Sequence, residues 1–237
     1  MDFGKAFTFV FEDDDWIVKV LLAAAILLLG ILFSWVLLIP LILALLLLGG
    51  YSVEITRRVI QGDPNTLPEW DNWGDMFVDG LKVFVIGIVW GLPTIIVGMC
   101  FGFMIAVLGE SAEGFTAFLS FLLSCFNIVW AIVMSITLPA AIGHFVANDD
   151  LSAAFRFGEV LGLVRDNFVT YLLTFIMSWV AGLIGSLGAL LCFVGWFVTI
   201  PYASFVTGHL YGQAYVEATG GTVVAVVEEV DVFEEID

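Results

Sequence analysis

Charge is what this sequence lacks over most of its length. Only seven of its 237 residues are Lys or Arg, and four long stretches contain no Asp, Glu, Lys or Arg at all. A hydrocarbon core about 30 Å thick is crossed by roughly 20 helical residues, so stretches of this length exclude a water-soluble globular fold. These charge-free stretches are residues 20–53, 83–109, 114–148 and 167–216.

The scarcity of basic residues excludes a second class of function. Twenty-four Asp and Glu residues give a formal net charge of −17, and such a surface repels nucleic acid and anionic headgroups. Many carboxylates with few lysines also suit a salt-rich cytoplasm, which suggests a halophilic source. Stability that is equal in dilute buffer and in molar salt would contradict that suggestion.

Cysteine is scarce as well, so no disulfide framework or cysteine metal site is expected. Cys100, Cys125 and Cys192 all fall within charge-free stretches and show no metal-ligand spacing. We therefore expect them to be buried, small apolar residues.

The hydrophobic stretches predict an all-α, polytopic membrane protein with about six transmembrane helices arranged as three hairpins. Residues 20–53 are too long for one crossing, and a tight turn near Ser34, Trp35 and Pro40 divides them into two. Residues 167–216 divide near Gly185 in the same way. One transmembrane domain is thus expected over residues 1–215, with spans at about 16–33, 36–57, 83–108, 115–147, 167–186 and 189–214.

The distribution of basic residues gives the orientation. In the six-span arrangement all seven Lys and Arg residues fall on one side, and cytoplasmic loops carry the excess of positive charge. We therefore expect a multi-pass protein of the cell membrane with both termini in the cytoplasm.

Two segments between hairpins are expected to lie as amphipathic helices on the cytoplasmic surface, at about 69–82 and 151–165. In the first, Trp70, Trp73 and Phe77 recur at helical spacing, while Asp71, Asp75, Asp79 and Lys82 follow the same period on another side. A carboxylate row of this length spreads over more than about 10 Å of helix, so it favours a solvated face over a calcium site. Residues 216–237 are expected to form an acidic cytoplasmic tail.

A weak internal repeat runs through the chain. The sequence FGKAFTFV at residues 3–10 resembles FGEVLGLV at 157–164, and each predicted hairpin ends in a glycine followed by an aromatic or histidine residue. These pairs are Gly50 with Tyr51, Gly143 with His144, and Gly208 with His209. All copies would share one orientation, unlike the inverted repeats of transporters.

Small residues spaced by four along the spans favour close packing between helices. The pairs are Gly87 with Gly91, Gly98 with Gly102, Ala181 with Gly185, and Gly185 with Ala189.

The candidate site is a polar cluster at the cytoplasmic helix ends. Tyr51, Glu54, His144 and His209 are ionisable groups near the membrane surface, where such residues are functional hypotheses by default. Two histidines and a carboxylate suit a metal or a proton relay, but His and Tyr also simply anchor helix ends at the interface. No catalytic triad, phosphate loop, metal motif or cofactor motif is present, so no enzyme activity, metal or cofactor is expected.

Three segments carry a resemblance to a known family. They are LPEWDNWGDMFVDGLK at 67–82, GGYSVEITRRVIQGD at 49–63 and LPAAIGHFVANDDLSAAFRFGEVLGLVRDN at 138–167. Over about residues 1–215 the chain resembles the archaeal and bacterial multi-pass membrane proteins grouped as domain of unknown function number 4013. The resemblance implies a membrane protein and brings no catalytic or binding residues with it.

Three functions follow from these features as hypotheses. The first is a non-enzymatic membrane protein that assembles partners through its acidic cytoplasmic face, with lipids and protein partners or a second copy of itself as contacts. The alternative is a transporter or channel for a small, weakly polar solute, suggested by Pro93, Pro139 and Pro201 inside the spans. The third is a membrane-embedded enzyme acting on lipid, which would need His144 and His209.

Overall fold

The structure is a computed structural model that describes residues 1–34, 38–63, 67–108, 113–190 and 195–220. These residues are almost entirely helical, and none of them lies in a β-strand. In chain order the elements are α1 (Phe3–Thr8), η1 (Phe9–Glu12), α2 (Trp16–Leu32), α3 (Ile39–Gln61), α4 (Trp73–Leu108), α5 (Glu113–Asn148), η4 (Leu151–Phe155), α6 (Phe157–Asp166), α7 (Phe168–Leu187), η5 (Gly188–Leu190) and α8 (Trp196–Ala218).

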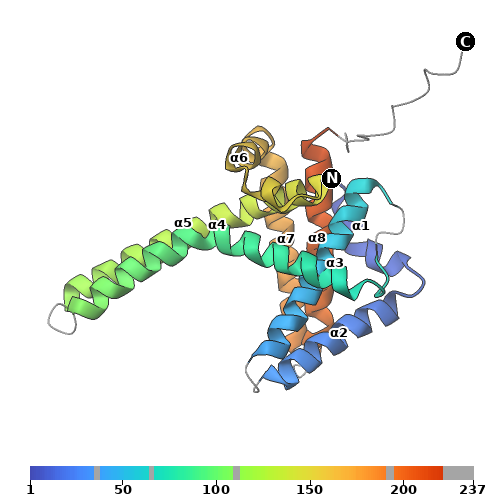
Figure 1. Cartoon of the computed structure of the whole chain (residues 1–237), viewed down its shortest axis with the longest axis horizontal. Helices are drawn as coiled ribbons and strands as arrows, with labels where there is room; N and C mark the ends of the chain where they lie inside the picture. Colours follow the sequence, from blue (N-terminus) through green and yellow to red (C-terminus); the bar gives the residue numbers. More distant parts are fainter. Residues whose placement is uncertain (35–37, 64–66, 109–112, 191–194, 221–237) are drawn as a thin grey trace, which may run out of the picture.

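A bundle of α2, α3, α7 and α8 forms the body of the molecule (Figure 1). The central helix is α8, which contacts α2, α3, α5 and α7. Its neighbours therefore bury much of its surface, and this burial allows α8 to carry a polar residue such as His209 away from lipid.

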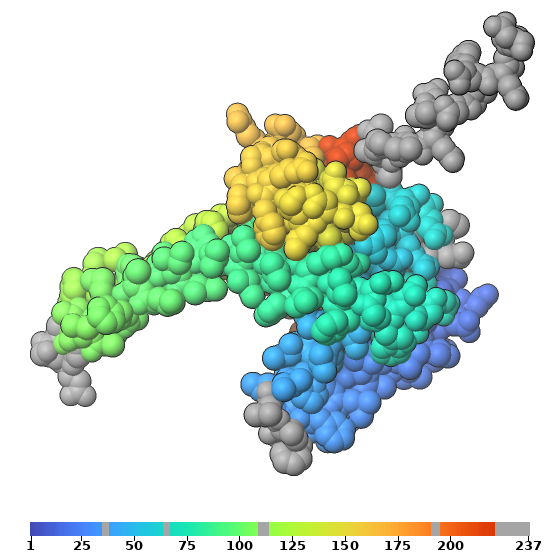
Figure 2. Space-filling view, viewed as in Figure 1, coloured from blue at the N-terminus to red at the C-terminus, as the bar shows by residue number. Residues whose placement is uncertain are grey.

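A long hairpin of α4 and α5 projects from this body, as the space-filling view shows (Figure 2). Each helix has 36 residues and is about 54 Å long at 1.5 Å per residue. The buried residues of α4 all lie in its first half, the last being Trp90. Trp90 donates its indole N–H to the carbonyl of Ala154 at 3.1 Å, and Trp130 of α5 donates to the carbonyl of Trp90 at 3.2 Å. These two bonds fix the root of the hairpin, beyond which apolar side chains face outward.

Four helical segments are long and apolar enough to cross a membrane: Ile39–Gln61, Trp73–Leu108, Gly114–Asn148 and Phe168–Leu190. A fifth would be the pair Phe3–Glu12 and Trp16–Leu32, bent by 95° at their junction. The described residues thus provide four or five candidate crossings by length and composition, rather than the six expected from the sequence.

The expected surface helix at about 69–82 is not a separate element. Residues from Trp73 onward are the first turns of α4, which continues without a break to Leu108. The amphipathic segment and the apolar segment after it contain no proline before Pro93, so one continuous helix accommodates both. The second expected surface helix, at about 151–165, is divided into η4 and α6 at Arg156.

Glycines bring neighbouring helices into close contact at several crossings. A Cβ on Gly50 would lie 1.7 Å from the carbonyl oxygen of Met76, and one on Gly80 would lie 1.9 Å from that of Leu46. A Cβ on Gly208 would lie 2.6 Å from the carbonyl oxygen of Ser52. Gly143, the other hairpin-end glycine of the repeat, would meet the side chain of Tyr215. All three hairpin-end glycines of the internal repeat are therefore sites of close helix packing.

Two of the expected packing pairs are wrong. A Cβ on Gly87, Gly91, Gly98 or Gly102 would have no neighbour within 4 Å, because this side of α4 faces away from α5 and from the bundle. Gly185 does pack closely, with 3.0 Å between an added Cβ and the Cβ of Ala203.

The expected burial of the cysteines is also wrong where the structure describes them. Cys100 and Cys125 are exposed, because both lie on the projecting hairpin. Cys192 and the tail beyond Gly220 lie outside the described residues.

Candidate functional site

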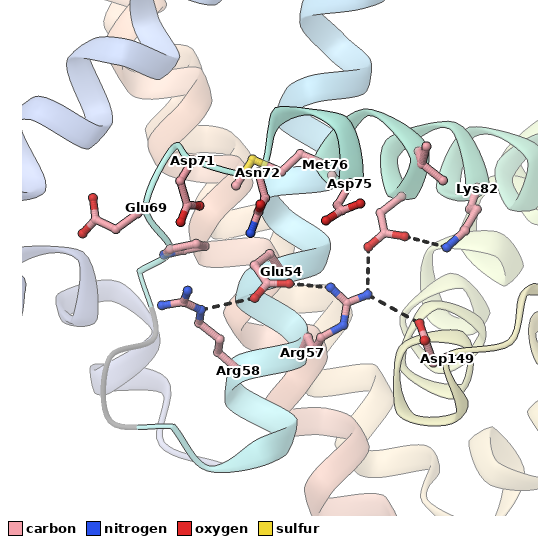
Figure 3. Close-up of a pocket in the computed structure, with 14 residues that line it drawn as sticks. Glu54, Arg57, Arg58, Glu69, Asp71, Asn72, Asp75, Met76, Lys82 and Asp149 are labelled. Atoms are coloured by element: carbon pink, nitrogen blue, oxygen red, sulfur yellow. Dashed lines mark hydrogen bonds and ion pairs between the residues drawn. The ribbon is translucent and has the colours of Figure 1, made fainter.

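An acidic pocket of about 340 Å³ lies where α3, the start of α4 and the residue after α5 meet (Figure 3). Six carboxylates and three basic side chains line it, so its net charge is negative. We call it the acidic pocket; its charged residues are Glu54, Glu69, Asp71, Asp75, Asp79, Asp149, Arg57, Arg58 and Lys82.

Arg57 is the centre of an ion-pair cluster in one wall of this pocket. Its guanidinium binds Asp79 at 2.8 Å and also pairs with Glu54, while Asp149 lies 3.9 Å away. Lys82 binds the other oxygen of Asp79 at 2.8 Å. The Asp79 side chain is only 9% exposed, so its two cationic partners offset the cost of removing the carboxylate from water.

Local sequence and one helix crossing together build this cluster. Glu54 lies three and four residues before Arg57 and Arg58, and Asp79 lies three before Lys82, so each pair shares a helix face. The close approach of α3 and α4 at Gly50 and Gly80 then brings Arg57 within reach of Asp79. The cluster therefore depends on the glycine crossing.

The opposite rim of the pocket carries two carboxylates that remain available. Asp71 and Asp75 are exposed, and neither forms a hydrogen bond or ion pair with another residue in the part of the chain that the structure describes. Figure 3 shows both side chains beside the pocket, with Glu69 next to Asp71. Glu69 is 64% exposed and binds Lys19 at 2.5 Å. This rim offers negative charge without an internal counterion at two positions.

An aromatic stack holds the segment that carries the rim. Tyr51 donates its hydroxyl to the carbonyl of Pro68 at 2.7 Å and stacks on Trp70 at a ring separation of 4.3 Å. Trp70 contacts Trp73 at 5.3 Å and donates its indole N–H to the carbonyl of Lys19. These contacts order residues 67–73 and so fix where the rim carboxylates lie.

The four residues of the predicted polar cluster do not come together. Glu54 lines the acidic pocket and Tyr51 supports its rim. His209 is buried, lies 4.4 Å from the ring of Phe9 and contacts Gln213. His144 lies elsewhere, against α6 and α8. Within the described ranges, no three His, Cys, Asp or Glu side chains are grouped as a metal site requires.

His144 belongs to a second pocket of about 480 Å³, between α5, α6, α7 and α8. Because a carboxylate only accepts hydrogen bonds, Nε2–H of His144 donates to Glu159 at 3.1 Å. Nδ1 then accepts from the hydroxyl of Tyr215 at 3.2 Å in the neutral imidazole. This histidine pocket is lined by His144, Glu159, Gly162, Leu163, Asp166, Asn167, Tyr215, Ala218 and Thr219.

The histidine gives Glu159 a testable titration. The hydrogen bond from His144, together with the positive charge of Arg156, lowers the pKa of Glu159 below the ordinary value of about 4.3. The folded-state pKa is therefore below the unfolded one, so this contact stabilises α6 above about pH 4.3 and is lost as the pH falls through the folded value. Replacing His144 with Ala is expected to raise the pKa of Glu159, measured from its carboxyl carbon resonance, which Glu159→Gln would assign.

Ser152→Ala is the matched control for that titration. The Ser152 hydroxyl and amide lower the pKa of Asp150 and do not contact Glu159. This change should alter the pKa of Asp150 and leave that of Glu159 unchanged. If the titration midpoint of Glu159 stays the same in His144→Ala, the contact between His144 and Glu159 would be refuted.

The most important partnerships of the acidic pocket were missed by the sequence reasoning. The sequence pattern predicts one solvated face for the carboxylates of 71–79, but Asp79 is buried against Arg57 while Asp71 and Asp75 are exposed. One signal is present in the sequence, because Arg57 and Arg58 lie close to the end of a charge-free stretch and therefore need nearby carboxylates. The positions of the two arginines do not show which carboxylates they pair with.

A family model described as "Protein of unknown function (DUF4013)" matches residues 32–194. The matched region contains every charged residue that lines the acidic pocket. No curated protein and no solved structure matches the chain.

Proposed function

This chain belongs to the DUF4013 family of proteins of unknown function, and from its acidic pocket we propose that it docks a basic segment of a partner protein at the membrane surface. The protein is an assembly factor in the membrane and has no catalytic role. The observation that carries this proposal is the pair of exposed, unpaired carboxylates, Asp71 and Asp75, on a rim ordered by aromatic stacking.

Charge complementarity selects the kind of partner. The pocket contains twice as many carboxylates as basic side chains, and its three basic groups are already paired with Glu54 and Asp79. An approaching Lys or Arg side chain would therefore meet uncompensated negative charge at the rim. A nucleic acid or an anionic lipid headgroup would be repelled.

Several contacts support a cytoplasmic position for this face. The amino group of Met1 pairs with Glu217 near the end of α8, so the two ends of the described chain lie together (Figure 1). Arg57 near the end of α3 reaches Asp149 just after α5, and Lys19 reaches Glu69 just before α4. Basic residues at these helix ends favour the cytoplasmic side, and six crossings, with α2 and α8 included, would keep both termini there.

Neutralising the rim should weaken binding of a basic ligand without unfolding the protein. We expect the full chain in uncharged nanodiscs to bind a fluorescent Lys/Arg-rich peptide with an affinity that falls as salt rises. The double variant Asp71→Asn/Asp75→Asn should bind roughly tenfold more weakly, which corresponds to about 1.4 kcal/mol. Its thermal midpoint should not fall, because neither carboxylate has an internal partner.

A control with the same change of net charge separates site binding from general attraction. Glu12 and Asp14 are exposed and do not line the acidic pocket. Glu12→Gln/Asp14→Asn should leave the peptide affinity almost unchanged. Equal losses in both double variants would show that only net charge matters and would contradict the proposal.

A further inference from the structure

Two hydroxyl groups on α7 are buried without a hydrogen-bond partner among the described residues. They are the Tyr171 hydroxyl and the Ser178 hydroxyl. Tyr171 is completely buried and packs in the same core cluster as Phe145 and Tyr215. A buried hydroxyl without a partner is costly in the interior of a membrane protein, where lipid supplies no hydrogen bonds.

These hydroxyls belong to a polar stripe on one face of α7. Asn167, Tyr171, Thr174 and Ser178 follow one another at steps of four, three and four residues, which places them on the same side of a helix. The Thr174 side chain is completely buried, donates to the carbonyl of Thr170 at 2.8 Å and contacts the sulfur of Met1 at 3.7 Å. At 1.5 Å per residue the stripe extends about 16 Å along α7.

The stripe begins at an opening and ends at a closed contact. Asn167 and Tyr215 both line the histidine pocket, so the upper end adjoins a cavity that is open to solvent. Below Ser178 the same face continues with Ala181, which is completely buried, and Gly185, which packs closely against Ala203. The α7–α8 contact therefore closes the lower end, and the stripe does not form a path across the membrane.

We propose that α7 carries a hydrated polar track, in which water molecules entering from the histidine pocket bind the hydroxyls of Tyr171 and Ser178. Water is the ligand that matches these groups, because each hydroxyl needs only a small molecule that both donates and accepts. A charged ligand does not fit, because the stripe below Asn167 carries no charged side chain. The inference is independent of partner docking at the acidic pocket.

Radiolytic footprinting of the full chain in nanodiscs tests the track, because X-rays generate hydroxyl radicals from bound water in place. Tyr51 is the matched control, since it is also completely buried but donates its hydroxyl to Pro68. Tyr171 should be modified several times faster than Tyr51. Equal, slow modification of the two tyrosines would overturn the proposal.

Thermal unfolding gives a second, independent readout. If water binds the hydroxyl, Tyr171→Phe should lower the thermal midpoint by about 2–4 °C, whereas removing an unsatisfied hydroxyl leaves stability unchanged or raises it. Ser178→Ala should change the midpoint in the same direction. An unchanged or higher midpoint for Tyr171→Phe would overturn the proposal even if the variant folds well.

Discussion

Gly80→Ala is expected to destabilise the protein more than any other single methyl group added to α4. The new Cβ would lie 1.9 Å from the carbonyl oxygen and 2.7 Å from the carbonyl carbon of Leu46, and backbone atoms cannot move aside as a flexible side chain can. Overpacking of this kind costs about 3 kcal/mol or more, which corresponds to a loss of roughly 6–12 °C in thermal midpoint. Fluorescence-detected unfolding in detergent would measure it.

Gly87→Ala provides the control within the same helix. Nothing lies within 4 Å of a Cβ at this position, so the change only improves helix propensity, by up to about 1 kcal/mol. The midpoint should stay the same or rise. If Gly80→Ala and Gly87→Ala behaved alike, the close crossing of α3 and α4 would be wrong.

Arg57→Ala is expected to have the second-largest effect. It removes one of the two cations that neutralise Asp79, whose side chain is 9% exposed, and leaves this carboxylate only with Lys82. Removing one partner of a buried ion pair costs about 3 kcal/mol, mainly because the remaining charge is left uncompensated. The thermal midpoint should fall accordingly, and peptide binding should weaken because the wall of the acidic pocket loses its order.

Two further variants separate ion pairing from loss of the side chain. Arg58→Ala should cost less than about 1 kcal/mol, because Arg58 pairs with Glu54 in a partly exposed position. Adding Asp79→Asn to Arg57→Ala should recover part of the lost stability, since the buried charge is then removed as well. A double variant less stable than Arg57→Ala alone would contradict this explanation.

Much of the helical architecture could be predicted from the distribution of charge. A stretch of 34 residues without charge is too long for one crossing and forms α2 and α3, with Pro40 in the first turn of α3. The projection of α4 and α5 could not be predicted in this way. The first half of α4 carries Asp75, Asp79 and Lys82 and the second half carries no charge, yet the charge-free half is the one that projects, because an apolar helix face can meet either another helix or lipid.

The site was less predictable than the fold because its pairings join distant segments. Glu54 could be selected since it ends a charge-free stretch, but its role depends on Arg57 also reaching Asp79 across a helix crossing. His144 and His209 occupy matching places in the internal repeat, yet one binds Glu159 and the other is buried against Phe9. Helix packing, which local spacing does not encode, determines these partners.

Photo-crosslinking from the acidic pocket in native membranes tests partner docking most directly. A photoreactive residue at Asn72, which lines the pocket between the two rim carboxylates, leaves Asp71 and Asp75 intact. We predict a discrete adduct whose crosslinked peptide is rich in Lys and Arg, and which is lost in high salt and in the Asp71→Asn/Asp75→Asn background. An adduct that persists in that background, or crosslinks to lipid alone, would contradict docking of a basic partner at this pocket.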